Sequence, residues 1–537
     1  MQDELATWRP EWQDLRDYIH PFRGIFDGEN PNKGSKRDRK LYNNSPYLAM
    51  RTCAAGLMTG MTPASRPWFK LGLDDPDLSD YGDVRGWLDR VQRMMYSIFA
   101  KSNIYNVLYS VYEELAAFGT AACIIQENYD TVIRGRTFTV GEYALSTNGN
   151  LTVDTFSRFV WMPVHAVVSE FGINNVTEST RSLYNLNQMD QWIRVKHIIE
   201  PNDTRIPGMA NSNNKKYRSV YWEEGSPHNE YLRISGYDEF PVLSPRWDVV
   251  SSDIYGRGPG FAALSNSKMI QVMEKDKLQA LDKLVNPPLV APGSAQNYGV
   301  NTLPGGISWI PDTAVNVGIK PAYQVNPDIG GIQQAIADTT NLINRSFYAD
   351  LFLMLSYGTQ GTMTAREVVE RHEEKLQNLG PVVERLQTEL LRPLIERTFA
   401  IMERTGILPP PPESVQGMDL KIEYVSTLSQ AQKMVGTAAK EQIAAFTSSL
   451  LAINPEITDA IDWDELVQQY ADDLGLPEGI VRADDDLEKI RTQRAQQMQA
   501  AQQSQQMQQM IQGAKTLSET DLTQQNALTA LTGGLMQ

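Results

Sequence analysis

The sequence is poor in cysteine and lacks long apolar runs. Its 537 residues include two cysteines, Cys53 and Cys123, which lie among small or apolar neighbours. We therefore expect buried, unpaired thiols in a reducing compartment rather than a disulfide scaffold. No window reaches the roughly 18 continuous apolar residues that a membrane-spanning helix needs. Because Met1–Glu4 also lacks a charged-then-apolar signal pattern, we expect a protein of the cytoplasm without membrane contact.

The sequence also lacks the usual signatures of catalytic and cofactor sites. There is no Gly-x-x-x-x-Gly-Lys-Ser/Thr loop for phosphates and no Gly-x-Ser-x-Gly turn for a nucleophilic serine. The acidic runs Asp74–Asp77 and Asp484–Asp486 resemble metal-binding clusters only superficially, since neither has the spacing of a calcium loop. Single, scattered histidines provide no zinc site: His20, His165, His197, His228 and His372. We expect no enzyme, no metal and no cofactor.

Positive charge is in deficit. Lys and Arg total 49 against 65 Asp and Glu, a formal net charge of −16. This balance argues against tight non-specific binding of nucleic acid, which depends on basic residues that neutralise phosphates, but it leaves loose contact with DNA open. The densest basic run, Asn32–Lys40, is either a solvated loop or a contact for a partner. Ordinary shares of apolar residues (41%) and charged residues (21%) predict a folded chain of several domains.

Helices and strands are expected in separate parts of the chain. Apolar residues spaced by three and four predict a first helix, on one face of which lie Leu5, Trp8, Trp12, Leu15 and Ile19. The other predicted helices of the N-terminal part are 45–61, 83–101 and 103–118. From Thr120 to about Val250 the pattern changes to short runs rich in β-branched and aromatic residues, separated by turn residues. We expect an antiparallel sheet inserted among helices, so the predicted fold class is α+β.

Two long helices follow the sheet region. The first is predicted over 261–285 and ends at Asn286-Pro287-Pro288, because residues before proline avoid the helical conformation. Tyr255–Gly260 before it is either an anion-binding loop or, as we favour because Pro259 removes an amide donor, a tight turn. The second is predicted over 329–355, after strand candidates at 306–310 and 314–317. One face of it carries Ile332, Ile336, Ile343, Phe347 and Leu351. Together the two helices predict a stalk.

The last part of the chain mixes a loop, a long helix and a polar tail. Ser356–Gly361 is rich in glycine and small polar residues, which predicts an exposed loop. Thr364 and Glu367 form a capping-box pattern for a helix that runs to Thr405 and is kinked at Gly380-Pro381. A stiff Pro409–Pro412 linker and a strand at Leu420–Val425 come next. The Gln- and Met-rich tail 493–512 is either disordered or conditionally helical.

Several short motifs occur in a characteristic order. Tyr255-Gly256-Arg257 opens the first stalk helix, Val285-Asn286-Pro287 closes it, and Thr364–Val368 opens the kinked helix. Leu41–Ser45 and Pro67-Trp68-Phe69 precede them. Over roughly residues 3–470 this order resembles the portal, or head-to-tail connector, proteins of tailed bacteriophages, in particular those of short-tailed phages of the podovirus type. Each motif is weak alone, and their order is the specific signal.

The resemblance implies a closed ring of about twelve subunits around a channel of DNA width. It implies the following parts: a wing (1–256), a first stem helix (257–285), a clip (286–328), a second stem helix (329–355), a tunnel loop with a kinked wing helix (356–408), a crown (409–485) and a C-terminal Gln-rich barrel or disordered tail (486–537). The tunnel loop itself corresponds to about 353–363.

The resemblance also indicates candidate DNA-channel residues. The tunnel-loop candidates are Tyr357, Gly358, Thr359, Gln360, Gly361 and Thr362. The stem candidates are Lys268, Lys275, Lys277 and Lys283. Because Glu274, Asp276 and Asp282 share the first stem helix, its charge is 4 − 3 = +1. These lysines either touch passing DNA briefly or belong to an ordinary solvated helix face.

The partners implied by the resemblance are double-stranded DNA in the channel, the terminase large subunit, tail adaptor proteins, and the major capsid and scaffolding proteins. The protein is then a virion component at the capsid vertex, assembled in the host bacterial cytoplasm. Two other hypotheses stay open. One is a ring-forming structural adaptor of the virion that does not contact DNA. The other is a metal-dependent nuclease that uses Asp484–Asp486, in which case replacing these acids abolishes DNA cleavage.

Overall fold

The computed structural model describes most of the first 425 residues and short pieces beyond them. The described residues are 1–26, 40–73, 82–290 except 207, 210, 228 and 229, then 320–321, 327–357, 379–412, 420–425, and short stretches between 440 and 498. The chain divides into two compact units, Met1–Val435 and Gly436–Gln537. In the second unit, the described residues include the short helical stretches 443–447 and 490–494. All structural features below belong to the first unit.

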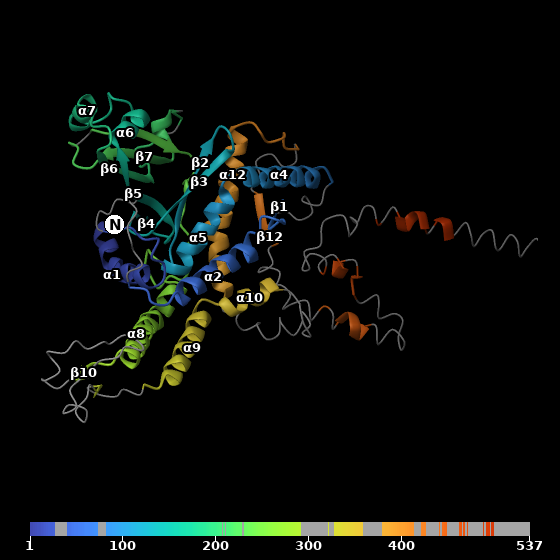
Figure 1. Ribbon diagram of the computed structural model, residues 1–537. Coiled ribbons are helices and arrows are strands. Elements are labelled where there is room, and N and C mark those ends of the chain that lie inside the picture. The colour runs from blue at the N-terminus through green and yellow to red at the C-terminus, as the bar shows by residue number, and fades with distance from the viewer. Residues whose placement is uncertain are drawn as a thin grey trace, which may run out of the picture. The chain divides into compact units, whose positions relative to one another are not determined.

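Four helices form the N-terminal part of the first unit (Figure 1): α1 (Gln2–Tyr18), α2 (Ser45–Met61), α4 (Gly82–Lys101) and α5 (Ile104–Phe118). These bounds confirm the four predicted helices. The predicted apolar face of α1 is buried, with Trp12 and Leu15 fully inaccessible to solvent. Helix α5 is buried from Val111 to Phe118 and ends at Gly119, whose φ of 73° is the left-handed conformation that glycine accepts readily. Helix α5 is therefore the centre of the core.

The sheet region is confirmed between Ala122 and Leu243. Strands β2 (Ala122–Asn128), β3 (Val132–Phe138) and β9 (Val242–Leu243) form a three-stranded antiparallel sheet in the order β3-β2-β9. A second antiparallel sheet has five strands in sequential order: β4 (Tyr143–Thr147), β5 (Val153–Pro163), β6 (Trp192–Pro201), β7 (Tyr217–Glu223) and β8 (Arg233–Tyr237). The mixture of helices with antiparallel sheet confirms the α+β class.

Two short helices that the sequence analysis did not predict lie between β5 and β6. They are α6 (Val164–Phe171) and α7 (Glu178–Asn185). A small hydrophobic cluster joins Val167 and Phe171 of α6 to Val195 and Tyr221 of the five-stranded sheet. One face of this sheet is thus covered by α6. Both helices are short. Half of α6 is valine or phenylalanine, so the composition of α6 resembles strand.

The two stalk helices pack along each other, but the second is not continuous. Helix α8 (Pro259–Val285) matches the first predicted helix. The predicted helix 329–355 is wrong as a single element, because it consists of α9 (Ile329–Ser346) and α10 (Ala349–Tyr357). Tyr348 between them has a φ of 54°, which an α-helix cannot contain. Strand β10 (Leu289–Val290) pairs with β11 (Lys320–Pro321). The strand candidates 306–310 and 314–317 lie outside the described residues.

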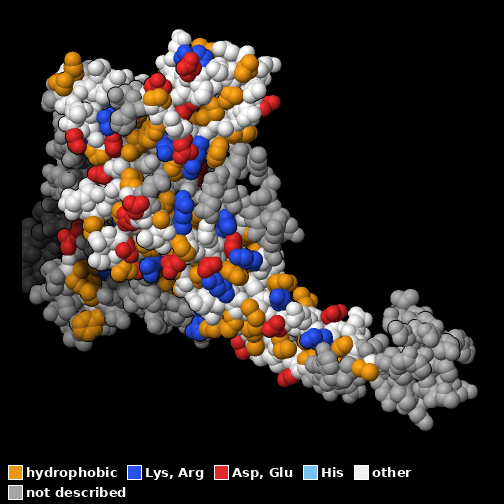
Figure 2. Space-filling model, turned by 90° about the vertical axis from the view of Figure 1, so that its left-hand side faces the viewer, with side chains coloured by type: hydrophobic (Ala, Val, Ile, Leu, Met, Phe, Trp, Pro, Cys, Tyr) orange, Lys and Arg blue, Asp and Glu red, His pale blue; other side chains and the backbone are white. Residues whose placement is uncertain are grey.

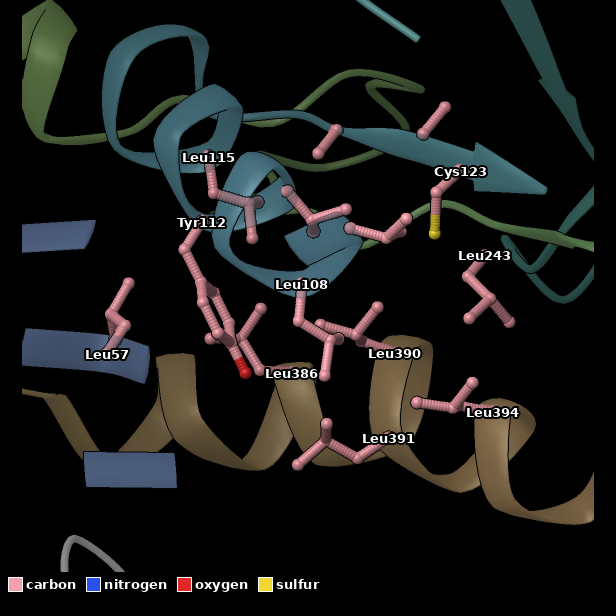
Figure 3. Packing of buried hydrophobic residues seen from close by; sticks show 14 of the residues in the cluster. Leu57, Leu108, Tyr112, Leu115, Cys123, Leu243, Leu386, Leu390, Leu391 and Leu394 are labelled. Atoms are coloured by element: carbon pink, nitrogen blue, oxygen red, sulfur yellow. The ribbon is translucent and has the colours of Figure 1, made fainter. Parts of the chain in front are cut away.

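The long helix after the loop is described from Leu379 onward. Residues 379–386 are α-helical, Gln387–Leu391 form one π-helical turn, and α12 spans Arg392–Arg404. The predicted capping box at Thr364 and the residues before the predicted kink lie outside the described part of the chain. Figure 3 shows Leu386, Leu390 and Leu394 of this helix directed toward Leu108 and Leu115 of α5. The long helix therefore forms one wall of the core.

A small sheet connects distant parts of the chain. The predicted strand at Leu420–Val425 is confirmed as β12 (Leu420–Tyr424), which pairs antiparallel with β1 (Phe69–Leu73). The Tyr96 hydroxyl accepts hydrogen bonds from the Trp68 and Phe69 amides at 2.9 and 2.8 Å. It donates to the Phe69 carbonyl at 2.7 Å. Pro67-Trp68-Phe69 thus leads into β1, which is held by its pairing with β12 and, at its first residue, by the Tyr96 hydroxyl.

A charged network is buried in this core. Glu114 of α5 is fully buried, and its carboxylate contacts the Arg23 guanidinium at 3.3 Å and the Val140 amide at 3.4 Å. Burial raises the pKa of Glu114 to about 7, although Arg23 and the hydrogen bonds from Thr139 and Val140 act in the opposite direction. Arg23 also pairs with Glu113 at 3.1 Å. This network holds the segment after α1 against α5.

Both cysteines are buried and unpaired, as predicted. Burial raises the pKa of Cys123 to about 12 and raises that of Cys53 further, so neither thiol is a ready nucleophile. His20 is also buried, and burial together with Arg23 and Arg51 lowers its pKa to about 3. Among the helices that the structure describes, none is long and apolar enough to cross a membrane.

Candidate functional site

The base of the first stalk helix is a crossing of two backbone segments. Gly119, at the end of α5, meets Gly256 and Gly258 before α8. A Cβ atom at Gly258 would lie 2.7 Å from the Leu115 carbonyl oxygen, and one at Gly260 would lie 2.0 Å from that of Ala117. These distances are far below van der Waals contact, so only glycine fits. The glycine-rich stretch is therefore a close-packed crossing of extended backbone and not the tight turn predicted, since Gly258 is extended and Arg257 pairs with Asp248 in a β-bridge.

Hydrogen bonds fix this crossing. The Gly256 amide donates to Thr120 Oγ1 at 2.7 Å, and the Arg257 amide donates to the Asp248 carbonyl at 2.7 Å. Pro259 occupies the first turn of α8, where its missing N–H is not needed. The direction in which α8 leaves the core is thus set by backbone contacts rather than by flexible side chains.

A second anchor lies close to the middle of α8. Gln271 is buried, and its side-chain oxygen accepts hydrogen bonds from the Tyr42 and Asn43 amides at 2.6 and 2.9 Å. Its side-chain nitrogen donates to the Asn43 carbonyl at 2.8 Å, and Asn43 Nδ2 donates to Glu274 at 2.9 Å. The Leu41–Ser45 motif therefore contacts α8. Sequence reasoning missed Gln271, because nothing local distinguishes it from a solvated glutamine.

The four candidate lysines of α8 have different surroundings. Lys268 forms an ion pair with Asp14 of α1 at 2.6 Å and lies 5.6 Å from the centre of the Tyr18 ring. Lys277 pairs with Glu274 one turn away. Lys275 and Lys283 are exposed. In Figure 2, basic and acidic side chains alternate along the projecting helices. The structure brings no group of lysines together on α8, and channel contact by these residues stays a prediction.

The two stalk helices share a small apolar seam. Ile336, Thr339 and Ile343 of α9 are buried, and Thr339 approaches the sulfur of Met273 of α8 at 3.9 Å. Helix α10 then turns against α2, where Phe352 lies directly over Gly56. A side chain at position 56 would collide with this ring, so glycine there allows α10 to pack closely on α2.

The predicted tunnel loop falls mostly outside the described residues. Helix α10 ends at Tyr357, so Ser356 and Tyr357 belong to its last turn and not to the loop predicted from residue 356. Gly358, Thr359, Gln360, Gly361 and Thr362 are not among the residues that the structure describes. Their role in a channel remains a prediction.

An unpredicted ion pair connects the stalk base to the long helix. Arg246 is 5% exposed, and its side chain donates to both carboxylate oxygens of Glu389, with the shortest distance at 2.6 Å. The Arg246 amide adds a bond to Glu389 at 2.9 Å, and the guanidinium also reaches the Ile254 and Leu151 carbonyls. Glu389 lies in the π-helical turn Gln387–Leu391. π-Helical turns are rare, and those that occur are frequently found at functional sites.

No catalytic or metal centre emerges in the part of the chain that the structure describes. Within it, no group of three His, Cys, Asp or Glu side chains could hold a metal ion. The acidic runs Asp74–Asp77 and Asp484–Asp486 lie outside the described residues. A hollow of about 310 Å³ is lined by Tyr237, Arg397 and Arg404 among others. Both arginines pair with Glu239, so the hollow presents balanced charge rather than an unpaired reactive group.

Comparison with known proteins accounts for this architecture. A family model described as bacteriophage head to tail connecting protein matches residues 1–481. The chain is 42% identical over 532 residues to the probable portal protein of Bordetella phage BPP-1, covering 99% of this chain and 96% of the relative. It is 41% identical, with the same coverage, to the portal protein of Salmonella phage epsilon15. None of these matches names an enzyme. The chain therefore belongs to the bacteriophage head-to-tail connecting proteins, the portal protein family.

Proposed function

We propose that this protein forms a closed ring at one capsid vertex through which double-stranded DNA enters and leaves the phage head. The observation that carries the proposal is family membership over nearly the whole chain, at 42% and 41% identity to two portal proteins. In this proposal α8 and α9 are the stem, residues 286–328 the clip, 1–256 and 356–408 the wing, and 409–485 the crown. The clip docks the terminase large subunit during packaging and the tail adaptor proteins afterwards.

The charge of the molecule is consistent with a conduit. DNA has to slide, and many free lysines in a ring would hold phosphates and slow it. The chain carries a net charge of −16, and Lys268 and Lys277 are neutralised by Asp14 and Glu274. This leaves Lys275 and Lys283 as exposed cations on α8, repeated once per subunit around the ring. Contacts of this kind are brief and easily screened by salt.

The primary test is imaging of the purified chain by negative-stain microscopy, with mass photometry to count subunits. We expect rings of about twelve copies with an opening of duplex width, the closed cyclic assembly of a heterologous contact. Rings with an opening too narrow for a duplex would instead favour a structural adaptor that does not contact DNA. A chain that stays monomeric even with its cognate scaffolding protein would contradict the proposal.

The tunnel loop provides a second test. Deleting Gly358–Gly361 removes the glycine-rich part of the predicted loop. We expect rings of normal size and a strong loss of DNA packaging in a defined packaging reaction. Normal filling of heads by this variant would show that the loop is not needed for DNA passage. It would not contradict the proposed ring.

A further inference from the structure

The five-stranded sheet has one face that no described α-helix covers, although residues 212–215 lie against Gly236 at its edge. Helix α6 packs on the face that carries Val195 and Tyr221. Side chains alternate along strands, so the residues between them point the opposite way. This opposite face also holds the buried Val220 and the paired Arg218 and Glu200. Its other large side chains are Phe159 and Trp161 of β5, Trp192, Arg194, Lys196 and Ile198 of β6, Trp222 of β7 and Ile234 of β8. We call this set the aromatic face.

The aromatic face is apolar and partly exposed. Trp192 and Ile234 are 37% and 39% exposed, and the remaining members are partly exposed. None of its aromatic side chains belongs to either hydrophobic core cluster of the described residues. Antiparallel sheets usually present polar side chains on an uncovered face. Tryptophan and arginine are the residue types enriched at the energetic centres of protein interfaces.

The aromatic face carries an excess of positive charge. Lys196 lies opposite Trp222, and Arg194 lies 4.0 Å above the Phe159 ring. Both cations share one acid, Glu224, at 3.2 and 3.3 Å, which leaves a local charge of 2 − 1 = +1. On a chain with a net charge of −16, this face attracts an acidic and aromatic partner surface.

A surface of that kind exists on the same chain, at the tip of the β2–β3 hairpin. Tyr129 is fully exposed there, beside the exposed Asp130. The Asn128 side chain accepts hydrogen bonds from the Asp130 amide at 2.9 Å, and from the amide and hydroxyl of Thr131 at 3.0 and 3.1 Å. These bonds make the turn rigid, so little conformational entropy is lost when Tyr129 binds.

We propose that the hairpin tip of one copy, with Tyr129 as its anchor, docks on the aromatic face of the next copy. The inference rests on the proposed ring, because a closed ring needs two different, complementary surfaces on every subunit. Tyr129 stacks against Trp161 or Trp222, and Asp130 faces Lys196. One contact of this kind per subunit adds an aromatic anchor at a site away from the stem helices.

The first test exchanges charges across the contact. Asp130→Lys and Lys196→Glu each place like charges opposite one another, and we expect each to weaken ring formation at least about tenfold. The chain that carries both substitutions regains the complementarity and should form rings again. Tyr129→Ala should weaken rings to a similar degree, whereas Tyr129→Phe keeps the aromatic ring and should assemble normally. Mass photometry over a concentration series measures ring formation by all five variants.

The second test joins neighbours covalently. Cys53 and Cys123 are buried and should not react. Cysteines introduced together as Asp130→Cys and Lys196→Cys should therefore form a disulfide with each other across the contact between neighbouring subunits. Mild oxidation should give a ladder of linked subunits on a non-reducing gel, while either single variant should give at most dimers. Rings that form normally in all variants, without a ladder, would overturn the docking proposal and leave the portal function standing. Failure of the unmodified chain to form rings would count against the proposed function itself.

Discussion

The two halves of α8 have opposite surroundings. In the first half, Ala263, Ser267 and Ile270 are buried against the core, and Gln271 is locked to the segment before α2. After Gln271, all residues of the helix are described and none is buried. Leu284 and Val285 near its end are 49% and 72% exposed.

This contrast separates what the subunit determines from what an assembly determines. The first half is fixed by the subunit's own core, so changes there alter folding of the isolated chain. On the second half, Met273 still packs against the core beside Thr339 of α9, whereas Leu278, Leu284 and Val285 are about half or more exposed. Changes in the second half should affect assembly and leave the stability of the isolated chain nearly unchanged. We expect the loss of stability to be largest at the buried contacts of the core and smallest at the far end of α8.

The largest effect is expected at the glycine crossing. Gly260→Val places side-chain atoms where the Ala117 carbonyl lies, and neither backbone segment can move without disturbing α5. We expect a loss of more than about 3 kcal/mol in the free energy of unfolding, or no folded protein. Gly86→Ala in α4 is the matched control, because nothing lies within 4 Å of a Cβ there. It should be neutral or slightly stabilising in urea unfolding.

A large effect is also expected at the ion pair behind the stalk base. Glu389→Ala leaves the buried Arg246 without its carboxylate, which costs about 3 kcal/mol or more. Thermal unfolding should show a clear drop in Tm. Arg385→Ala removes the weaker neighbour of Glu389, 4.0 Å away and one third exposed, and should change Tm little. Equal effects of the two variants would contradict the importance of the Arg246 contact.

An intermediate, pH-dependent effect is expected at Glu114. Its folded-state pKa of about 7 lies above the ordinary value of 4.5, so the folded state holds a proton that the unfolded state releases between these values. The free energy of unfolding should therefore fall as pH rises from about 5 to 8. Glu114→Gln stays neutral and should flatten this slope in urea unfolding at pH 6 and pH 8. Glu113→Gln should keep the slope, and a slope unchanged in both variants would disprove the assignment.

The smallest effect on folding is expected at the far end of α8. Val285→Ser changes an exposed side chain and should alter the stability of the isolated chain by less than about 0.5 kcal/mol. Ile270→Ala in the first half is fully buried and should cost about 2 to 5 kcal/mol. If chemical unfolding shows that both variants lose a comparable free energy of unfolding, the two halves of α8 do not differ in the way proposed.

Much of the helical framework could be predicted from sequence. Helices α2 and α8 begin and end close to the predicted residues, because Pro46, Pro259 and the Pro287-Pro288 pair act on their immediate neighbours. The break at Tyr348 was missed, since Ile343, Phe347 and Leu351 keep helical spacing across it. Helix α6 was missed because its composition resembles strand. Helix α7 was missed because it has only eight residues, most of them polar, and so shows no apolar helical face.

The contacts around the stalk base could not be predicted in this way. The pattern around Gly258 and Gly260 indicated a turn. It did not indicate that Gly119 and Ala117, about 140 residues earlier in the sequence, lie against these glycines. Arg246 and Glu389 are 143 positions apart, and neither stands out locally. Gln271 likewise contacts Tyr42 and Asn43 from far along the chain. Such pairs depend on how whole elements pack.

The sequence by itself determined most of the longer helices, the change to strands after Thr120, the α+β class and the portal-like order of motifs. These features depend on residues within a few positions of one another, where periodicity, proline and glycine act directly. Only the tertiary structure decided that the glycines form a backbone crossing, that Arg246 holds the π-helical turn and that an aromatic face lies uncovered on the sheet. Those features arise when segments far apart in the chain meet, which no local pattern encodes.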